Sequence, residues 1–401
     1  MTMERPSFIL CYFETTRRCD RDCPHCMTRR SPSPSRPELS TDEARRLVLD
    51  EVKAICPAGA VSFSGGEILQ RADHLELIAH NARNGLYTFV NTSGHGLDSR
   101  SLREVKDAAA GRLTLGFSLD SVDPDVQGRC RGGAPGDLER LIRLCGEQEV
   151  PFFVVVTVSR KNLATLRPTL DWLSGRGISM IRSPFVPRGA AAGAPHLCFD
   201  RADMERTISP ALRDNPLGYV SYTPFFAAPD VTRLTLAGHG ISLASLGCQA
   251  GRTFIGIGAE GDVAPCVHLL DSPVCCGNVR EQPLSRIYDT SPIMRALRGE
   301  RPVGGKCARC RYGDSCRGCR SLAFYRTGDY LAEDPTCFFE PENIDARSPH
   351  EEAQTRNTLV FLNHLVRNRP WSDIFGARGR LGVFMLNLRA RIRELVGGLF
   401  W

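Results

Sequence analysis

Short apolar runs alternate with amphipathic segments over residues 8–190, and this alternation constrains the fold more than any other feature of the chain. The run 152–158, Phe-Phe-Val-Val-Val-Thr-Val, is apolar at nearly every position, as expected for a parallel strand that is buried on both faces. Apolar strands separated by helical segments are typical of βα units. The first part of the chain therefore predicts a parallel sheet of the α/β class with helices outside it.

Candidate strands and helices can be placed along this part of the chain. The strands are expected at 8–15, 60–64, 87–91, 113–119, 152–158 and 180–186. The helices are expected at 41–56, with Ser40 or Thr41 as N-cap, and at 73–84, 99–109, 137–148 and 162–175. Because there are six strands rather than eight, we expect a partial (β/α)6 barrel of TIM type. Its functional residues should lie at the carboxyl ends of the strands.

The composition predicts a soluble, cytoplasmic enzyme. The chain has 401 residues, of which 42% are hydrophobic, enough for one large core and a smaller domain. It has neither a secretory signal pattern nor an apolar run long enough to span a membrane. The net charge of +6 is modest, and no basic stripe is interleaved with aromatic residues, so a nucleic-acid partner is not expected. Seventeen cysteines predict metal ligands in a reducing compartment rather than disulfides.

Three cysteines follow the first predicted strand at short spacing. They are Cys19, Cys23 and Cys26, and a ring residue, His25, precedes the last of them. Three thiolates can hold one four-iron cluster and leave one iron open to a small chelating ligand. A zinc site or a chance group of buried thiols is the alternative, but three thiolates without a fourth nearby make a poor closed tetrahedral zinc site. The triplet therefore favours an iron–sulfur cluster.

Glycines and polar residues follow the next three strands, at the edge of the sheet where barrel enzymes carry their chemistry. Paired glycines allow a backbone to approach a ligand closely, although an ordinary turn is the alternative. Hydroxyl and carboxylate groups at the same edge could bind ribose hydroxyls. Arg131 lies just beyond, where a helix-surface arginine is the alternative. The residues at the strand ends are Gly65, Gly66, Glu67, Asn91, Ser118 and Asp120.

The Cys-x3-Cys-x2-Cys spacing together with the later Gly-Gly-Glu segment resembles the radical SAM enzymes. In that family the open iron chelates S-adenosylmethionine, and an electron from the cluster cleaves it to a 5′-deoxyadenosyl radical. The resemblance implies that Gly65-Gly66-Glu67 contacts the ammonium of the cofactor and that Asn91, Ser118 and Asp120 lie against its ribose. It also implies that Arg131 pairs with the methionine carboxylate and that residues 185–189 border the adenine.

A second cysteine system occupies residues 248–337. Two Cys-x2-Cys pairs within it could form a zinc ribbon, but the series as a whole resembles the SPASM domain, a C-terminal extension of radical SAM enzymes that holds two auxiliary 4Fe–4S clusters. One departure is that two residues rather than three separate Cys316 from Cys319. The cysteines of this series are Cys248, Cys266, Cys307, Cys310, Cys316, Cys319 and Cys337.

The resemblance also implies a ligand scheme. The first auxiliary cluster would be held by Cys248, Cys266 and Cys319. The second would be held by Cys307, Cys310, Cys316 and Cys337. The first cluster is then one thiolate short, so that either Cys275 or Cys276 supplies the fourth ligand, or one iron is open and could bind substrate.

Four parts of the chain are expected: the barrel at 1–190, a connection lining the barrel mouth at 191–244, the SPASM domain at 245–340 and a helical extension at 341–401. Within or next to the connection, His196, Tyr222 and His268 are polar candidates near the substrate. A long connection at a barrel mouth is well placed to line a substrate pocket. The role of general base is not assigned to any residue.

The function implied is that of a radical SAM/SPASM oxidoreductase that abstracts a hydrogen atom from its substrate and transfers electrons through the auxiliary clusters. A ribosomally made peptide or peptide-derived cofactor is the favoured substrate. The alternatives are a small molecule of antibiotic or modified-tetrapyrrole biosynthesis and, more remotely, a non-catalytic electron carrier. Only 18 residues precede Cys19, so a peptide would need a separate recognition protein. An external donor such as flavodoxin or ferredoxin is expected.

Overall fold

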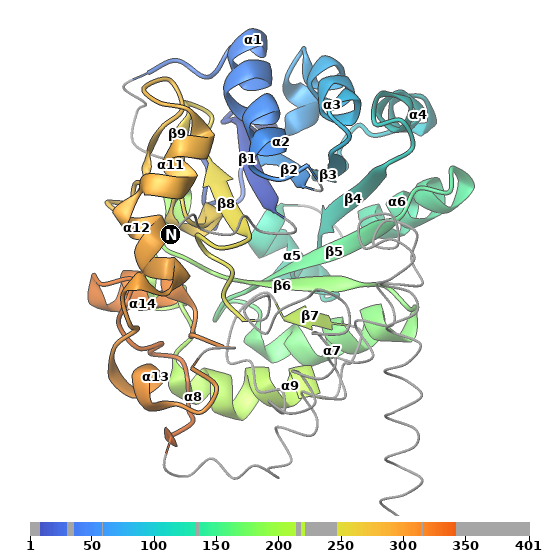
Figure 1. Ribbon diagram of the computed structural model, residues 1–401. Helices are drawn as coiled ribbons and strands as arrows, with labels where there is room; N and C mark the ends of the chain where they lie inside the picture. Colours follow the sequence, from blue (N-terminus) through green and yellow to red (C-terminus); the bar gives the residue numbers. More distant parts are fainter. Residues whose placement is uncertain are drawn as a thin grey trace, which may run out of the picture.

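The described residues form one continuous sheet with helices outside it (Figure 1). The computed structural model describes residues 9–29, 36–57, 59–132, 136–213, 218–220, 247–313 and 316–341. Within these ranges ten strands pair in the order β10-β9-β8-β1-β2-β3-β4-β5-β6-β7. Tyr222 and the extension predicted beyond residue 341 lie outside the described residues.

Six parallel strands make up the centre of the sheet, and they confirm the partial barrel that the apolar runs predict. Each pairs in parallel with the next along the chain. Their outward side chains, such as Phe13 and Phe63, are buried in the main core beneath the helices. The strands are β1 Leu10–Thr16, β2 Ala60–Gly65, β3 Tyr87–Asn91, β4 Leu113–Ser118, β5 Phe152–Val158 and β6 Met180–Pro184.

Four short strands extend this sheet at both edges, and the sequence analysis does not anticipate them. β7 (Gly218–Val220) pairs with β6, and β8 (Phe254–Ile257) pairs in parallel with β1. β9 (Asp262–Ala264) and β10 (Gly277–Asn278) then continue antiparallel. Strands this short carry too few residues for a reliable period in the sequence. Because β8 hydrogen-bonds to β1, the cysteine-rich region is built directly onto the edge of the barrel.

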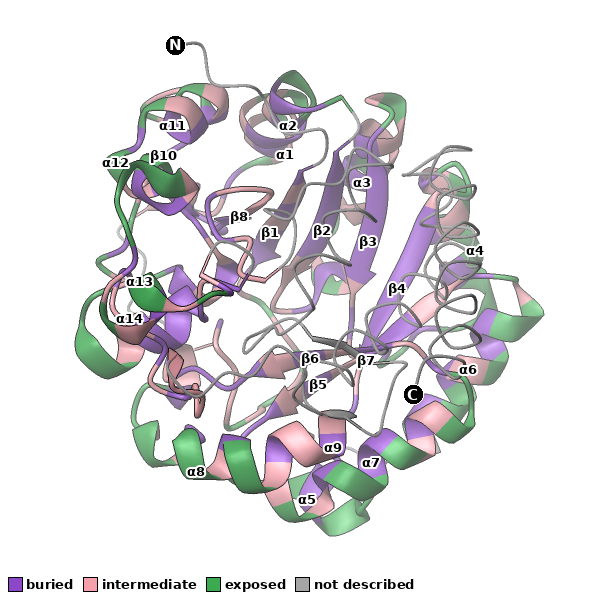
Figure 2. Cartoon of the chain, turned by 60° about the horizontal axis from the view of Figure 1, so that its bottom comes forward, coloured by how far each residue is buried: buried purple, intermediate pink, exposed green. Residues whose placement is uncertain are grey.

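The expected helices of the barrel are present. The first begins at a capping box, in which the Ser40 hydroxyl and the Glu43 carboxylate each accept a backbone N–H, and it runs through α1, a π-helical stretch and α2. The barrel helices are α1 Thr41–Glu43, η1 Ala44–Leu49, α2 Asp50–Ile55, α3 His74–Arg83, α4 Ser99–Ala108, α6 Gly136–Glu147 and α7 Leu163–Gly175. Figure 2 shows that these helices are exposed on their outer faces while the central strands are buried.

One further helix, α5 (Pro124–Arg131), is absent from the sequence analysis. Its N-cap is Asp123, whose carboxylate accepts the backbone N–H groups of Asp125 and Val126, and it ends at Gly132 with φ 69°. An Asp-Pro pair at a helix start and a glycine just past its end are recognised helix signals. These local signals could therefore have identified the helix that carries Arg131.

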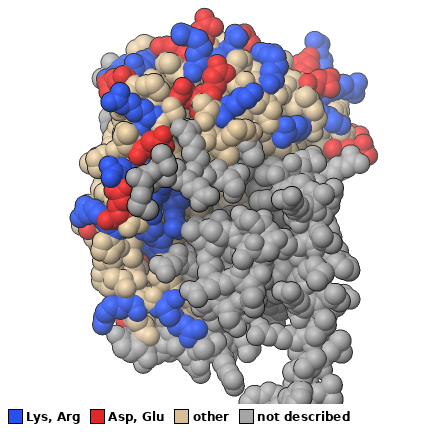
Figure 3. Space-filling model, in the orientation of Figure 1, with Lys and Arg blue, Asp and Glu red and all other residues tan. Residues whose placement is uncertain are grey.

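Short helical segments make up most of the remaining described residues. No helix among the described residues is long and apolar enough to cross a membrane. On the face shown in Figure 3, basic and acidic side chains intermingle over α1 to α4. The segments are η2 Ile68–Gln70, η3 Gly189–Ala191, η4 Pro195–Leu197, α8 Arg201–Asp203, η5 Met204–Ile208, α9 Ser209–Arg213, η7 Val267–Leu269, α11 Leu284–Thr290, α12 Pro292–Arg295, η8 Ala296–Glu300, α13 Gly305–Arg309 and α14 Arg320–Thr327.

Candidate active site and auxiliary metal centres

The inward side chains of the barrel form an apolar floor with a polar layer above it. Tyr87, Phe89 and Phe153 cluster at the floor. Toward the carboxyl ends of the strands, Asn91 donates from Nδ2 to the Ser62 hydroxyl at 2.6 Å. The Tyr12 hydroxyl lies beside this pair: burial raises the pKa of Tyr12, and its hydrogen bonds to the two side chains offset part of that rise. Asn91, Ser62 and Tyr12 thus form a polar group above the aromatic floor.

The loop that leaves β1 carries the first cysteine triplet, whose thiols are half-buried. The backbone N–H of Arg21 points to the Cys19 sulfur at 3.4 Å, and that of Arg29 points to the Cys26 sulfur at 3.2 Å. The Cys23 sulfur lies 3.8 Å from the carbonyl oxygen of Arg131. N–H groups directed at sulfur stabilise thiolate ligands of iron–sulfur clusters. The donor set and its hydrogen bonds therefore fit a three-thiolate cluster.

The paired glycines after β2 pass directly against the start of this loop. Gly66 N–H donates to the Thr16 carbonyl and Glu67 N–H donates to the Arg18 carbonyl, both at 2.7 Å. A Cβ on Gly66 would collide with the Arg18 carbonyl oxygen, and Gly65 has a φ of 119° that side chains rarely adopt. The glycines are therefore required by the close approach of the two backbones. Their expected contact with the cofactor ammonium stays a prediction.

Gly66→Ala should displace the cysteine loop, because no space exists for the added methyl group. We expect the variant to lose the first cluster, about four irons per chain, as measured by iron analysis after anaerobic reconstitution. Gly146→Ala in α6 is the matched control: nothing lies within 4 Å of its added Cβ, and alanine in place of glycine within a helix stabilises by roughly 0.5–1 kcal/mol. Equal iron contents in the two variants would contradict the prediction.

Glu67 joins the loops that follow β2 and β3. Its side chain is buried, and one carboxylate oxygen accepts the backbone N–H of Ser93 at 2.8 Å and the Ser93 hydroxyl at 2.9 Å. The other oxygen accepts the N–H of Leu69 at 3.3 Å. The carboxylate is therefore engaged in positioning the two loops.

Asp120, at the end of β4, is the centre of a buried charge network. It accepts Arg131 Nε at 2.8 Å, Arg131 Nη2 at 3.2 Å and the backbone N–H of Thr157 at 2.8 Å. His25 Nε2 lies 3.2 Å from the same carboxylate. Burial acts to raise the pKa of Asp120, but the charges of Arg131 and His25 outweigh it and hold the pKa well below its usual range. The network ties the cysteine loop to the ends of β4 and β5.

Arg131 keeps one side of its guanidinium open. Besides Asp120 it reaches the Thr157 hydroxyl, 3.1 Å from Nη2, but Nη1 donates to no partner within the described part of the chain. Ser118, two residues before Asp120, is half-buried on the inward face of β4. The structure therefore brings Ser118, Asp120 and Arg131 to the same side of the barrel mouth as Cys23.

A second buried charge network joins the barrel to the cysteine-rich region, and sequence reasoning missed most of it. Arg188 donates to both oxygens of Glu14, at 2.9 and 2.8 Å, and to Asp271 at 2.8 Å. Arg17 donates to Glu260 at 2.6 Å and to Asp271 at 2.8 Å. Only Arg188 stands out in the sequence, as part of the segment expected to border the adenine. The other partners lie far apart along the chain and carry no local signal.

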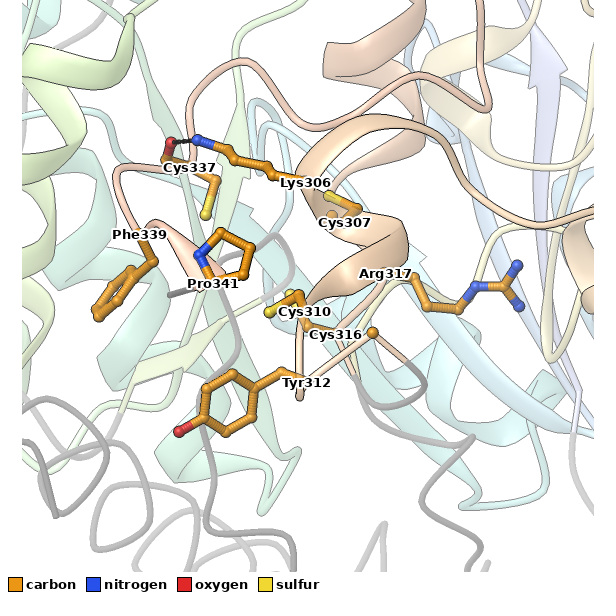
Figure 4. Close-up of a pocket in the computed structure, with 11 residues that line it drawn as sticks. Lys306, Cys307, Cys310, Tyr312, Cys316, Arg317, Cys337, Phe339 and Pro341 are labelled. Atoms are coloured by element: carbon orange, nitrogen blue, oxygen red, sulfur yellow. Dashed lines mark hydrogen bonds between the residues drawn. The ribbon is translucent and has the colours of Figure 1, made fainter. Parts of the chain in front are cut away.

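Four of the later cysteines line one pocket, as Figure 4 shows. Cys307 and Cys316 are buried, and burial raises the pKa of Cys337 to about 12. Four thiols that line one pocket can act together as ligands of a metal or cluster, which binds them as thiolates. The pocket contains Cys307, Cys310, Cys316 and Cys337, with Lys306, Tyr312, Phe339 and Pro341 around them.

Three further cysteines form a neighbouring set. Burial raises the pKa of Cys266, and the thiols of Cys248 and Cys319 raise it further. Burial and the Cys248 thiol likewise raise the pKa of Cys319 to about 12. The backbone N–H of Cys248 donates to the Cys316 carbonyl at 3.1 Å, which links this set to the pocket. Cys248, Cys266 and Cys319 therefore lie close to one another and next to the pocket, and the ligand scheme stays a prediction.

The two candidates for the missing fourth thiolate, Cys275 and Cys276, differ in environment. Cys275 is exposed, with its thiol 3.6 Å from the Gly277 carbonyl oxygen. Burial raises the pKa of Cys276 to about 12, and the neighbouring Ser291 side chain offsets part of that rise.

The two described histidine candidates differ in environment. His196 is exposed in the short turn η4. His268 is half-buried two residues after Cys266, with Nε2 3.0 Å from the hydroxyl of Ser183 on β6. Burial and the charge of Arg188 lower the pKa of His268 to about 4. Of the two, only His268 contacts a barrel strand at the mouth.

Comparisons with known proteins give the family. Residues 13–173 match the model of the radical SAM superfamily, and residues 248–320 match SPASM, an iron–sulfur cluster-binding domain. An AdoMet-dependent heme synthase of Methanosarcina barkeri is 30% identical over 353 residues, covering 82% of this chain and 96% of that protein. A PqqA peptide cyclase of Rhodopseudomonas palustris is 28% identical, covering 87% and 92%.

A solved structure shares the fold. Streptococcus suis SuiB bound to the precursor peptide SuiA matches with a TM-score of 0.63 and 17% identity, over 83% of this chain and 76% of that one. The matched ranges contain the cysteine triplet of the β1 loop and the later cysteine series except Cys337, and the heme synthase relative covers 82% of this chain. The chain therefore belongs to the radical SAM superfamily, as an enzyme whose cofactors are S-adenosylmethionine and 4Fe–4S clusters and whose C-terminal part is a SPASM domain.

Proposed function

We propose that the chain is an oxidoreductase that removes a hydrogen atom from a modified tetrapyrrole and passes an electron to its auxiliary clusters. Similarity to the AdoMet-dependent heme synthase over nearly the whole length of that relative supports a tetrapyrrole. The position of Cys248, Cys266 and Cys319 supports electron transfer to an auxiliary cluster. The Cys266 thiol acts on the pKa of Tyr12, an inward residue of β1, so a substrate in the barrel mouth would lie between the two cysteine systems.

The first auxiliary cluster, in this proposal, has three protein thiolates and one open iron. Cys248, Cys266 and Cys319 are its ligands, and the exposure of Cys275 and its contact with Gly277 support this assignment. An open iron beside the barrel mouth could bind a polar group of the substrate. His268 and Ser183 would line the same side of the mouth.

The S-adenosylmethionine site, in this proposal, is built from the polar ends of β2, β3 and β4. The cofactor supplies the one-electron chemistry that removes the hydrogen atom. Because the Glu67 carboxylate is engaged by Ser93, contact with the cofactor ammonium falls to the backbone of Gly65 and Gly66. Asn91 and Ser118 lie against the ribose. Because both Asp120 oxygens are already hydrogen-bonded, Asp120 acts as a positioning residue that directs Arg131.

Asp120→Asn should weaken cofactor binding without removing the cluster. The variant leaves Arg131 without its charged partner, so Nη1 is no longer directed at the methionine carboxylate of the cofactor. We therefore expect KM for S-adenosylmethionine to rise about tenfold, the equivalent of roughly 1.4 kcal/mol. Asp125→Asn, at an exposed position of α5, is the matched control and should keep the wild-type KM. An unchanged KM in Asp120→Asn, at full iron content, would refute the positioning role.

An external one-electron donor such as flavodoxin or ferredoxin, and a cytoplasmic location, belong to the same proposal. Ten of the cysteines are assigned here as cluster ligands, and thiolate ligands require a compartment that keeps thiols reduced.

The substrate class can be tested directly. Reconstituted, reduced protein is incubated anaerobically with S-adenosylmethionine. One arm contains iron coproporphyrin, a carboxylated iron tetrapyrrole, and the other contains a panel of short peptides. We expect the tetrapyrrole to stimulate 5′-deoxyadenosine formation and to change in mass, with no change in the peptides. Conversion of a peptide alone would overturn the tetrapyrrole proposal. It would support the peptide substrate that the sequence analysis favours, which is also consistent with the similarity to the PqqA peptide cyclase.

A further inference from the structure

Arg320 is a buried cation between the two auxiliary cysteine sets. It starts α14 directly after Cys319 and is 1% exposed. Nη1 donates to the carbonyl oxygens of Tyr330 at 3.1 Å and Ala332 at 2.7 Å, and Nε donates to that of Gly318 at 3.3 Å. Nη2 is buried and has no hydrogen-bond partner among the described residues. Among the described residues, the hydrogen bonds of this charge therefore go to backbone carbonyls alone.

The negative charge near Arg320 comes from thiols and from one buried carboxylate. Asp334 accepts the backbone N–H of Cys319 at 2.7 Å and that of Thr336 at 2.9 Å, and its charge raises the pKa of both Cys319 and Cys337. Asp334 thus adds to the negative charge that the thiolates of both sets would carry. Buried charges are unfavourable unless opposite charges compensate them. The positive charge of Arg320 would compensate the negative charge of clusters held by several thiolates.

Gly318 lines the pocket of Figure 4 and also lies against Arg320. A Cβ on this glycine would lie 2.5 Å from Arg320 Nη2 and 3.4 Å from the Cys307 sulfur. The same Cβ would lie 2.6 Å from the Asp334 Cβ, so the unpartnered nitrogen, the Asp334 side chain and a thiol of the second set all pack closely around Gly318. Its φ of 62° also suits glycine.

We propose that Arg320 raises the reduction potential of the second auxiliary cluster, the one assigned to Cys307, Cys310, Cys316 and Cys337. A cluster gains one negative charge when it is reduced by one electron, so a nearby buried cation stabilises the reduced form. Transfer of that electron from the first auxiliary cluster, which is oxidised in the step, to the second is then favoured. This inference rests on the proposed ligand assignment and is independent of the identity of the substrate.

The test is a redox titration followed by electron paramagnetic resonance, without substrate. The background is the full chain with Cys19, Cys23 and Cys26 changed to Ala, so that only auxiliary signals remain. We expect Arg320→Gln to lower the midpoint potential of one auxiliary cluster by at least about 59 mV. For a one-electron couple this equals a tenfold change in the equilibrium constant of reduction. Arg320→Lys, which keeps the charge, should stay close to the parent.

Arg326→Gln is the matched control, because it removes the same charge from the same helix. Arg326 is exposed and donates to the carbonyls of Cys198 and Phe199, so its loss should leave both potentials unchanged. An unchanged potential in Arg320→Gln, or an equal fall in Arg326→Gln, overturns the proposal. Loss of about four irons in Arg320→Gln also overturns it, since Arg320 would then hold the site together rather than set its potential.

Discussion

Cys23→Ala is expected to abolish cleavage of S-adenosylmethionine. Cys23 sits between the other two cysteines of the β1 loop and lies against the Arg131 carbonyl, and two thiolates do not hold a site-differentiated cluster. We expect 5′-deoxyadenosine formation to fall on the order of a thousandfold or more. The iron content should drop from about 12 to about 8 per chain. Both quantities are measured on anaerobically reconstituted, dithionite-reduced protein.

Cys145→Ala is the control for this experiment. Cys145 is an almost fully buried cysteine on α6 that belongs to none of the three cysteine sets. Removing its sulfur should cost about 1 kcal/mol of stability and leave iron content and turnover unchanged. A Cys23→Ala protein that cleaves the cofactor as fast as wild type would rule out the triplet as the cluster site.

Arg188→Met is expected to have the largest effect on stability. The change removes the cation that holds both oxygens of Glu14, which is completely buried. Breaking a buried pair by removing one partner costs about 3–5 kcal/mol, because the remaining charge stays in a low dielectric. Urea denaturation of the reconstituted protein should show this loss in the free energy of unfolding. The SPASM region should also become more accessible to protease, since Arg188 joins β1 to Asp271.

Two further variants separate the buried charge from general disruption. Replacing Glu14 by Leu as well as Arg188 by Met removes both charges and should recover part of the loss, as a double-mutant cycle would show. Arg100→Met breaks an exposed ion pair with Glu104 and should cost no more than about 0.5 kcal/mol. Equal losses for Arg188→Met and Arg100→Met would mean that the buried network is not stabilising.

Features that depend on short stretches of chain could be predicted from the sequence. The βα units follow from apolar runs and helix caps such as Ser40, because burial on both faces dictates the composition of a parallel strand. The three-cysteine loop follows from spacing alone, because one cluster can be held by neighbouring thiols. The α5 helix had usable local signals in Asp123 and Pro124, although the sequence analysis did not use them.

Features that depend on distant parts of the chain were decided by the tertiary structure. The pairing of β8 with β1 joins segments more than two hundred residues apart, and no local period marks it. Glu67 and Asp120 look like ligand-binding carboxylates in the sequence, but their oxygens are taken by Ser93, Thr157 and Arg131. A hydrogen-bond partner on another strand leaves no trace in the spacing of residues.

The sequence by itself determined the family chemistry, because cluster ligands and barrel strands are encoded in local residue type and spacing. Only the tertiary structure decided how the pieces are joined: Arg188 to Glu14, Arg131 to Asp120, and Arg320 beside Gly318 and Cys307. The physical reason is that a buried charge must find its partner wherever the fold provides one. That partner is set by the packing of strands and loops rather than by neighbours in the chain.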